Sequence, residues 1–216
     1  MERAALAEAG GGRRPDFPGL PASWRTPADV LLARPAAGRR LETGIAAIDK
    51  ACRGGFQIPR LVTLQGPPSV GKTTLAMQIA ERLASVDNAI VVALLPDEGP
   101  EAAGVRFGQN MGFHREKLED GDSDELVAFD AKTCRMPVWF PDPDELPENT
   151  LEAVMERTAK FAGWYADRPA VLVVDSTQTA VLGAEEPDDV RKRIEAIMSA
   201  LRVWTRTTPG LVINVA

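Results

Sequence analysis

Short runs of hydrophobic residues alternate with amphipathic stretches from residue 41 to the end of the chain. Continuous apolar runs of this length are typical of strands that are buried on both faces of a parallel sheet. They cover residues 60–65, 89–95, 170–174 and 210–215, and a shorter run at 138–140 predicts a further strand. The pattern therefore predicts an α/β fold with a mostly parallel, twisted sheet and helices on both faces.

Between these runs, apolar residues recur at three- and four-residue spacing, which predicts amphipathic helices. The clearest helix begins at Val190, and Ile194, Ile197, Leu201 and Trp204 follow on one face. Other helices are predicted over residues 73–83, 101–111 and 151–165. The acidic segment 116–130 lacks this period, so we expect a loop there with a strand at 126–129.

The first forty residues differ in composition from the rest of the chain. They are rich in Ala, Gly, Pro and Arg, and residues 10–15 read Gly-Gly-Gly-Arg-Arg-Pro, which cannot build a core. A short helix is predicted at 27–32, because Thr26 can cap it and Pro27 suits its first turn. We expect a flexible N-terminal extension over residues 1–40 and one domain over residues 41–216.

Charge and composition exclude several functional classes. Residues 1–60 carry ten Lys and Arg against six Asp and Glu, whereas residues 61–216 carry fifteen against twenty-five. This acidic balance differs from that of an autonomous, high-affinity nucleic-acid binder. Two distant cysteines and one histidine argue against a disulfide framework and against histidine metal clusters. No apolar run approaches the ~18–20 residues of a membrane span, so we expect a cytoplasmic protein with no membrane partner.

The sharpest chemical signal directly follows the first predicted strand. Residues 66–73 read Gly-Pro-Pro-Ser-Val-Gly-Lys-Thr and match the G-x-x-x-x-G-K-[ST] pattern at each position. In such a loop, backbone N–H groups and a helix N-terminus hold a phosphate chain. The lysine reaches the β- and γ-phosphates, and the threonine hydroxyl ligates Mg²⁺. The predicted binding residues are Gly66, Pro67, Pro68, Ser69, Val70, Gly71, Lys72, Thr73 and Thr74.

Acidic residues follow two further predicted strands. Asp175 ends one of them and would hold Mg²⁺ opposite Thr73, because open α/β sheets bind ligands at the carboxyl ends of their strands. Glu98 lies just past another strand, where a carboxylate can orient or deprotonate the water that attacks the γ-phosphate. Asp97 is adjacent, so two candidates stand for this role, and we favour Glu98.

Taken in order, these motifs resemble the RecA-type P-loop ATPase core, in the branch of DnaB, RadA, KaiC and plasmid RepA-like helicases. In this family a "TG…LD…GG" segment precedes the phosphate loop, a Glu follows the next strand, and a Ser follows the Mg²⁺-binding Asp. The matching residues in this chain are Thr43-Gly44, Ile48-Asp49, Gly54-Gly55, Glu98 and Asp175-Ser176. The likeness covers residues 41–216.

The resemblance implies hydrolysis of ATP to ADP and phosphate. Lys72 and Glu98 would be catalytic, and Thr73 and Asp175 would hold Mg²⁺. It also implies a homo-oligomer, a ring or filament with ATP sites between subunits, and motor work on DNA as in a helicase or a recombination ATPase. The partners expected are therefore further copies of this chain and single-stranded DNA.

The chain departs from the family pattern near its C-terminus. There the family has a polar sensor, a second DNA-facing loop and often an Arg or Lys that reaches a neighbouring ATP site. Asn214 is the candidate sensor, and the chain stops at Ala216, so we expect a C-terminally truncated core or one that needs a partner. Residues 176–189 correspond to a DNA-facing loop, yet they are acidic and contain no Lys or Arg. Two alternatives stay open: a KaiC-like nucleotide-dependent switch without nucleic acid, and an ATP-binding fragment without turnover of its own.

Overall fold

The computed structural model describes residues 38–145, 148–183 and 189–216. The chain separates into two contact units, and all helices and strands named below belong to the unit Arg39–Ala216. The helix predicted at 27–32 and nearly all of the predicted extension lie outside the described residues. Within the described parts of the chain, no helix has the length and apolarity to cross a membrane.

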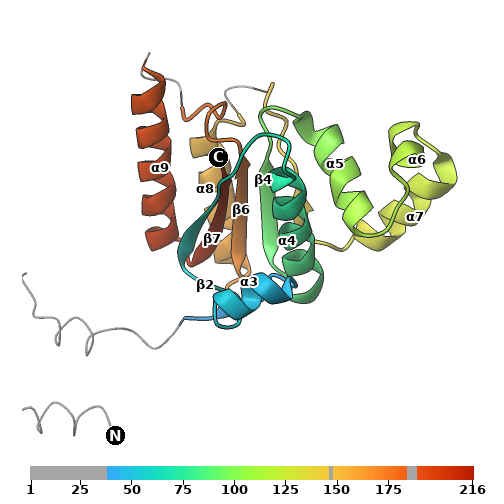
Figure 1. The fold of residues 1–216 in the computed structure, drawn as a ribbon, viewed down its shortest axis with the longest axis horizontal. Helices are drawn as coiled ribbons and strands as arrows, with labels where there is room; N and C mark the ends of the chain where they lie inside the picture. Colours follow the sequence, from blue (N-terminus) through green and yellow to red (C-terminus); the bar gives the residue numbers. More distant parts are fainter. Residues whose placement is uncertain (1–37, 146–147, 184–188) are drawn as a thin grey trace, which may run out of the picture. The chain divides into compact units, whose positions relative to one another are not determined.

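Five parallel strands form the central sheet, in the order β3-β7-β6-β4-β5. Their bounds are β3 (Arg60–Leu64), β7 (Gly210–Val215), β6 (Ala170–Asp175), β4 (Ile90–Leu94) and β5 (Val138–Trp139). All four pairings are parallel, so the carboxyl ends of the strands meet at one edge, near the chain end marked C in Figure 1. The predicted α/β fold with a mostly parallel sheet is confirmed.

The helices and strands alternate along the chain as the sequence predicts. The helices are α3 (Ala46–Ala51), α4 (Lys72–Val86), α5 (Gly99–Asn110), α6 (Arg115–Glu119), α7 (Ser123–Thr133), α8 (Leu151–Trp164) and α9 (Val190–Thr207). The four predicted amphipathic helices correspond to α4, α5, α8 and α9, with bounds that agree within a few residues.

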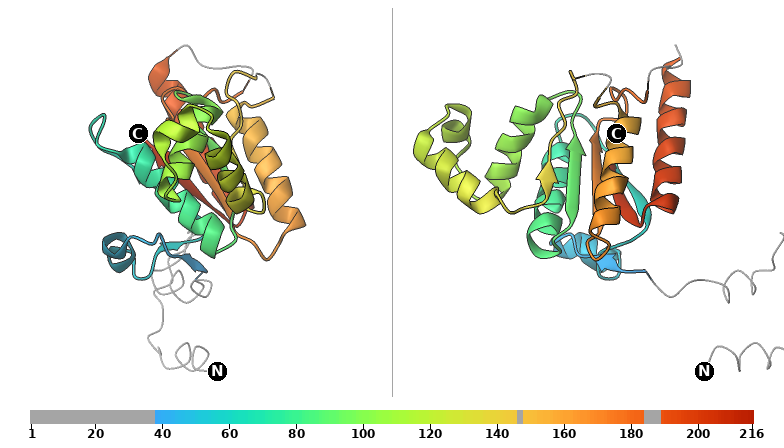
Figure 2. Two further views of the ribbon diagram at one scale, coloured as in Figure 1. Left: turned by 90° about the vertical axis from the view of Figure 1, so that its right-hand side faces the viewer. Right: turned by 180° about the vertical axis from the view of Figure 1, so that it is seen from behind.

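Alternate residues of the strands serve two different cores. In β6, Val171 and Val173 belong to a cluster that contains residues of α4 and α5, whereas Leu172 and Val174 belong to a cluster with residues of α8 and α9. Successive strand residues point to opposite faces, so the sheet carries one helical layer on each face (Figure 2). This burial on both sides explains why β4 is continuously apolar and why β6 and β7 are apolar except for Asp175 and Asn214 near their carboxyl ends.

A small antiparallel ribbon precedes the sheet. It joins β1 (Arg40–Leu41) to β2 (Phe56–Gln57), with α3 between them. The Asp49 carboxylate accepts hydrogen bonds from the Thr43 N–H and hydroxyl, both at 2.8 Å, and from the Gly44 N–H at 3.1 Å. Figure 1 shows α3 at the opposite end of the sheet from the marked C-terminus. Thr43, Gly44 and Asp49 therefore stabilise a turn rather than a ligand site.

The prediction of a loop with a strand at 126–129 is wrong. The segment 116–130 lies largely in two short helices, α6 and α7, which continue from α5 beyond the sheet (Figure 1). The Asp122 carboxylate caps α7 by accepting a backbone N–H at 3.0 Å, and further acidic residues in the first turn favour a helix. Phe129 packs edge-on against Phe113, with ring centroids 5.3 Å apart. The local caps and this packing outweigh the short apolar run that predicts a strand.

The two glycines before β2 have different surroundings, so substitutions at these two positions make a matched test of the packing. Gly54 and Gly55 have φ angles of 97° and 98°, so alanine at either position costs roughly 1–3 kcal/mol of backbone strain. A Cβ at Gly55 would in addition collide with the Leu41 backbone, lying 2.6 Å from its carbonyl carbon, whereas at Gly54 the nearest atom is the Arg40 Cδ at 3.9 Å.

We expect Gly55→Ala to lower the melting temperature clearly more than Gly54→Ala, as measured by thermal denaturation followed by circular dichroism. The extra loss has its origin in the collision with Leu41, which only the first substitution creates. Equal melting temperatures for the two variants would show that the ribbon does not pack as described.

Candidate functional site

The predicted phosphate loop connects the end of β3 to the start of α4. Gly71 caps α4 with φ of 90°, a conformation that favours glycine, and no atom lies within 4 Å of the place a Cβ would take. In the described part of the chain, no side chain caps α4 and its first turn contains no acidic residue. The N–H groups of this turn are therefore available to an anion, as the sequence pattern predicts.

The Lys72 side chain lies back over the loop. Its ammonium donates hydrogen bonds to the carbonyl oxygens of Gly66 at 2.9 Å and Pro67 at 3.0 Å. Pro68, Ser69 and Val70 follow at the exposed tip of the loop. A phosphate oxygen offers the ammonium a stronger, charge-assisted hydrogen bond than a neutral carbonyl does. Lys72 is thus held where it can turn to an anion that enters the loop.

Asp175 lies at the carboxyl end of β6, in contact with the first turn of α4. Its residue is 9% exposed, and its carboxylate forms a hydrogen bond with the Thr73 side chain. Thr74, the next residue of α4, is exposed. Burial raises the pKa of Asp175, and the nearby carboxylates of Glu98 and Asp97 act in the same direction, whereas the Thr73 hydrogen bond and Lys72 lower it. The structure therefore brings together the two residues predicted to hold Mg²⁺.

One Asp175 oxygen suits this pair of residues to a cation. Its Oδ2 atom is buried and has no hydrogen-bond partner among the described residues, a state that calls for a ligand. Within the described ranges, no group of three or more His, Cys, Asp or Glu side chains could form a metal site without other ligands. Mg²⁺ typically takes only one or two protein ligands and completes its shell with phosphates and water. Thr73 and Asp175 therefore fit Mg²⁺ bound together with a phosphate chain.

The two acidic candidates after β4 have different partners. Asp97 accepts a hydrogen bond from the Ser176 hydroxyl at 3.2 Å, which links the ends of β4 and β6. Glu98 instead accepts two hydrogen bonds from Arg106 of α5, one from Nε at 2.6 Å and one from a terminal nitrogen at 2.5 Å. The sequence predicts neither partnership. Arg106 in particular carries no motif signal, because an arginine on an amphipathic helix is usually solvated.

Two other predicted features lie around this edge. Asn214 is buried in β7, one residue before the strand ends, and its amide contacts the Met198 sulfur of α9 at 3.5 Å. Its side chain therefore faces the α9 layer, and its Oδ1 has no partner among the described residues. The predicted DNA-facing loop is described over residues 176–183 and at Asp189, which caps α9. There the carbonyls of Val181 and Leu182 accept hydrogen bonds from the first turn of α8.

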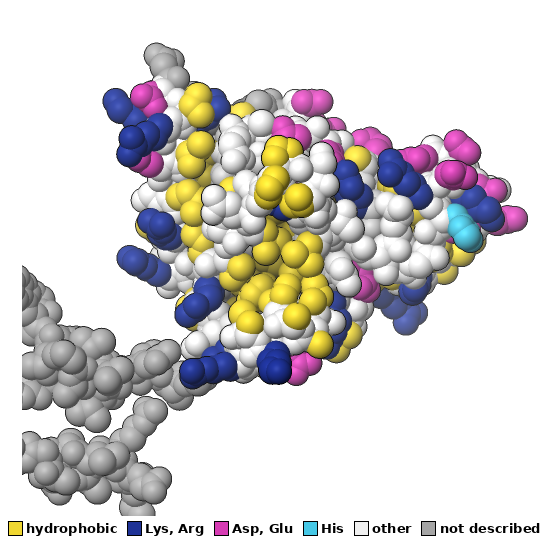
Figure 3. Space-filling model, viewed as in Figure 1, with side chains coloured by type: hydrophobic (Ala, Val, Ile, Leu, Met, Phe, Trp, Pro, Cys, Tyr) yellow, Lys and Arg dark blue, Asp and Glu magenta, His cyan; other side chains and the backbone are white. Residues whose placement is uncertain are grey.

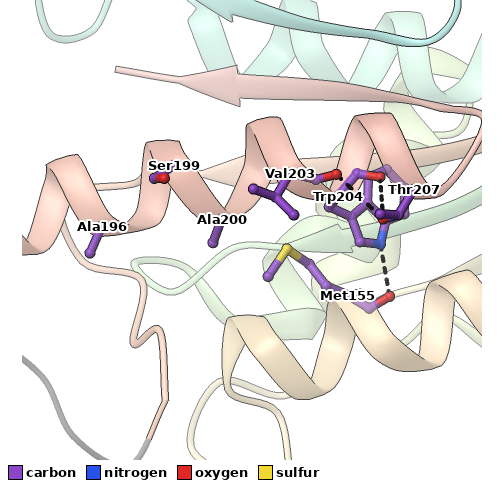
Figure 4. A pocket seen from close by; sticks show the side chains of 7 residues that line it. All are labelled: Met155, Ala196, Ser199, Ala200, Val203, Trp204 and Thr207. Carbon is purple, nitrogen blue, oxygen red and sulfur yellow. Dashed lines mark hydrogen bonds between the residues drawn. The ribbon is translucent and has the colours of Figure 1, made fainter.

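A groove of about 530 Å³ lies away from these residues, between α8 and α9 (Figure 4). The Trp204 indole donates a hydrogen bond to the Met155 carbonyl oxygen at 2.9 Å, so its polar atom is satisfied. The groove is lined by Met155, Ala196, Ser199, Ala200, Val203, Trp204 and Thr207. None of these side chains titrates, so the groove supplies no acid or base. The groups able to do chemistry lie at the carboxyl edge of the sheet.

Comparison with known proteins agrees with this geometry. Residues 41–213 match the family model described as "ATPase: KaiC". The chain is 36% identical over 204 residues to the DNA repair protein RadA of Mycobacterium tuberculosis strain CDC 1551 / Oshkosh, and the match covers 93% of this chain and 35% of that protein. RadA of Aquifex aeolicus strain VF5 is 25% identical over 140 residues, which cover 65% of this chain and 24% of that protein. The chain thus spans about a third of these relatives or less.

Solved structures show the same fold. A DnaB-like replicative helicase, described with its interactions with primase, superposes with a TM-score of 0.70 at 15% identity, over 87% of this chain and 45% of that chain. Another solved ATPase domain gives a TM-score of 0.67 at 15% identity, over 87% of this chain and 67% of that one. At this identity the likeness concerns the fold alone. Together with the family match over most of the chain, it shows that the protein belongs to the KaiC-type ATPase family and has a RecA-like P-loop ATPase core.

Proposed function

We propose that this chain binds Mg·ATP and hydrolyses it to ADP and phosphate. The observation that carries the proposal is the meeting of a phosphate loop with two acidic strand ends. The loop follows β3, Glu98 follows β4, and Asp175 ends β6 in hydrogen-bonding contact with Thr73. Hydrolysis needs a phosphate cradle, a metal site and a carboxylate near the γ-phosphate, and this edge carries residues of all three kinds.

Each side chain has a distinct role in the proposed reaction. The N–H groups of the loop and the first turn of α4 bind the phosphates, and Lys72 exchanges its carbonyl partners for phosphate oxygens. Thr73 and Asp175 would hold Mg²⁺, which would supply positive charge next to the phosphates. Glu98 orients a water and takes its proton. The water oxygen then bonds to the γ-phosphorus while the bond from that phosphorus to the bridging oxygen breaks, leaving ADP and phosphate.

We further propose that turnover is coupled to DNA handling by a homo-oligomer. The support comes from relatives whose names describe DNA repair and replicative helicase activity. Basic side chains also lie along α9, on the flank of the molecule shown in Figure 3. The chain as a whole has a net charge of −6. Arg191, Lys192, Arg202 and Arg206 are the exposed ones. Such a stripe is the kind of surface that contacts phosphates in a groove for single-stranded DNA.

A second candidate function is a nucleotide-dependent switch without nucleic acid. Two observations favour it. The matching family model is described by KaiC, and residues 61–216 carry ten more acidic than basic residues. Acidic surfaces repel the phosphate backbone, so this reading predicts nucleotide turnover that single-stranded DNA does not change.

The test is steady-state ATP hydrolysis with and without single-stranded DNA at low salt, for wild type, Glu98→Gln and Asp97→Asn. We expect DNA to stimulate wild-type turnover, because a DNA strand that several copies of the chain contact favours the homo-oligomer. Glu98→Gln should lower kcat by about 100-fold or more, the usual contribution of a general base. Asp97→Asn should lower it less, since the Ser176 hydroxyl can still donate to the amide oxygen.

Other results would change the assignment in defined ways. Turnover that ignores DNA would favour the switch, and turnover lost in Asp97→Asn but kept in Glu98→Gln would exchange the roles of the two acids. Bound Mg·ATP without turnover, even at high protein concentration, would mean that this chain is an ATP-binding fragment.

The buried charge of Asp175 lowers the stability of the nucleotide-free fold, although the proposed function needs that charge. Because burial raises its pKa, the folded state binds this proton more tightly than the unfolded chain does. The free energy of unfolding therefore falls as the pH rises from the ordinary pKa of 3.8 through the raised one, and the full cost is present above the raised pKa. Asp175→Asn removes the charge while it keeps an oxygen that can accept from Thr73.

We expect nucleotide-free Asp175→Asn to melt at a higher temperature than wild type above the raised pKa, because the variant buries no charge at this position. The difference should shrink as the pH approaches 3.8, and the variant should lose Mg²⁺-dependent turnover. Asp122→Asn, at the exposed cap of α7, is the control and should change neither property, because asparagine caps helices as well as aspartate. A lower melting temperature for Asp175→Asn, or a gain independent of pH, would contradict the account.

A further inference from the structure

Glu98 is engaged by a single arginine through both of its carboxylate oxygens. Arg106 lies eight residues further along the chain, and its Nε and one terminal nitrogen donate to Oε2 and Oε1 at 2.6 and 2.5 Å. Side chains of a helix lean toward its N-terminus, and Glu98 is the N-cap residue of α5, so the arginine reaches back along its own helix to the acid. The result is a planar, two-bond fork that fixes the carboxylate.

Stability alone is a weak reason for this pair. The Arg106 and Glu98 side chains are 32% and 29% exposed, and ion pairs with this much solvent contact contribute little to folding. The next helix, α6, carries an ordinary surface pair between Arg115 and Glu119, and both of these side chains are exposed. What distinguishes the Arg106 pair is the acid that it holds.

The charges around Glu98 favour a role in the site. Arg106 faces it from α5 and Asp175 faces it from the end of β6, with Asp97 next to it in the chain and Lys72 of α4 beside Asp175. The Glu98 hydrogen bond raises the pKa of Arg106, burial opposes this, and the negative charges of Glu98 and Asp175 raise it further. The guanidinium is therefore a permanent positive charge beside two carboxylates, those of Glu98 and Asp175.

We propose that Arg106 is a positioning residue that acts through Glu98: its guanidinium fixes the plane of the carboxylate and so presents a free lone pair to the attacking water. A carboxylate offers about four lone-pair directions, and the fork occupies two of them. A base held in one orientation spends no binding energy on ordering itself during the reaction. The inference rests on the proposed function of Glu98.

The experiment is a double-mutant cycle on ATP turnover by the full chain. Arg106→Ala should lower kcat by about tenfold or more and leave KM for ATP nearly unchanged, because misplaced catalytic groups affect the chemical step. Arg106→Lys should recover little, since an ammonium cannot form the planar fork. In the Glu98→Gln background Arg106→Ala should cost nothing further, because the arginine acts only through that acid. Arg115→Ala, which removes an exposed pair of the same kind, should match wild type.

A second measurement does not depend on turnover. Aluminium fluoride with Mg·ADP mimics the phosphoryl group in transfer, so its complex reports how well the water site is organised. Arg106→Ala should bind Mg·ADP as wild type does but should bind Mg·ADP with aluminium fluoride about tenfold more weakly, in line with the loss in kcat.

The outcomes separate this inference from the proposed function. Equal kcat and equal aluminium fluoride affinity in wild type and Arg106→Ala would overturn the role of Arg106, even if Glu98→Gln is inactive. If Arg106→Ala lowers kcat as much in the Glu98→Gln background as in wild type, the inference is also overturned, because the arginine would then act independently of Glu98. If wild type shows no turnover, the proposed function fails for this chain, and the aluminium fluoride affinities alone decide whether Arg106 organises the site.

Discussion

Three carboxylates lie near one another at the carboxyl edge of the sheet, and the site depends on how their repulsion is managed. Each acid has a partner of its own: Ser176 for Asp97, Arg106 for Glu98 and Thr73 for Asp175. These partners differ in charge and in burial, so the three acids are chemically distinct. Among the three, only Asp175 keeps a buried oxygen without a partner among the described residues. That oxygen is where a bound cation would relieve the repulsion.

The sheet provides the rigidity that such an arrangement needs. β4 and β6 pair in register from Ile90 with Ala170 to Leu94 with Val174, and both strands are buried along their full length. Their ends are therefore fixed relative to each other before any ligand binds. The phosphate loop and Glu98 belong instead to the connections that leave the sheet, and their contacts are made by side chains. The scaffold thus fixes Asp175, which is proposed to hold Mg²⁺, more firmly than the loop, and it leaves the lysine free to change partners.

Much of this site can be predicted from the sequence because strand ends and the phosphate-loop motif are local signals. A buried apolar run followed by Asp175 or Glu98 already places those acids at the same edge, once the strands are known to be parallel. The role of Arg106 could not be predicted, because it depends on which side chain lies within hydrogen-bonding distance of the guanidinium in the fold. No rule of sequence spacing predicts that contact. The helices α6 and α7 were missed for a related reason: caps such as Asp122 and the contact between Phe113 and Phe129 stabilise them, and neither produces a long helical period.

The central claim is that the loop after β3 and the end of β6 form one site for a nucleotide with Mg²⁺. Calorimetric titration with a non-hydrolysable ATP analogue tests it most directly, with Mg²⁺ or with a chelator, for wild type and Lys72→Ala. The account predicts one site per chain in wild type, and affinity that falls by about tenfold or more both without Mg²⁺ and in the variant, because each change removes a positive charge from the phosphates. Absence of binding in wild type, or binding that neither change weakens, would contradict it.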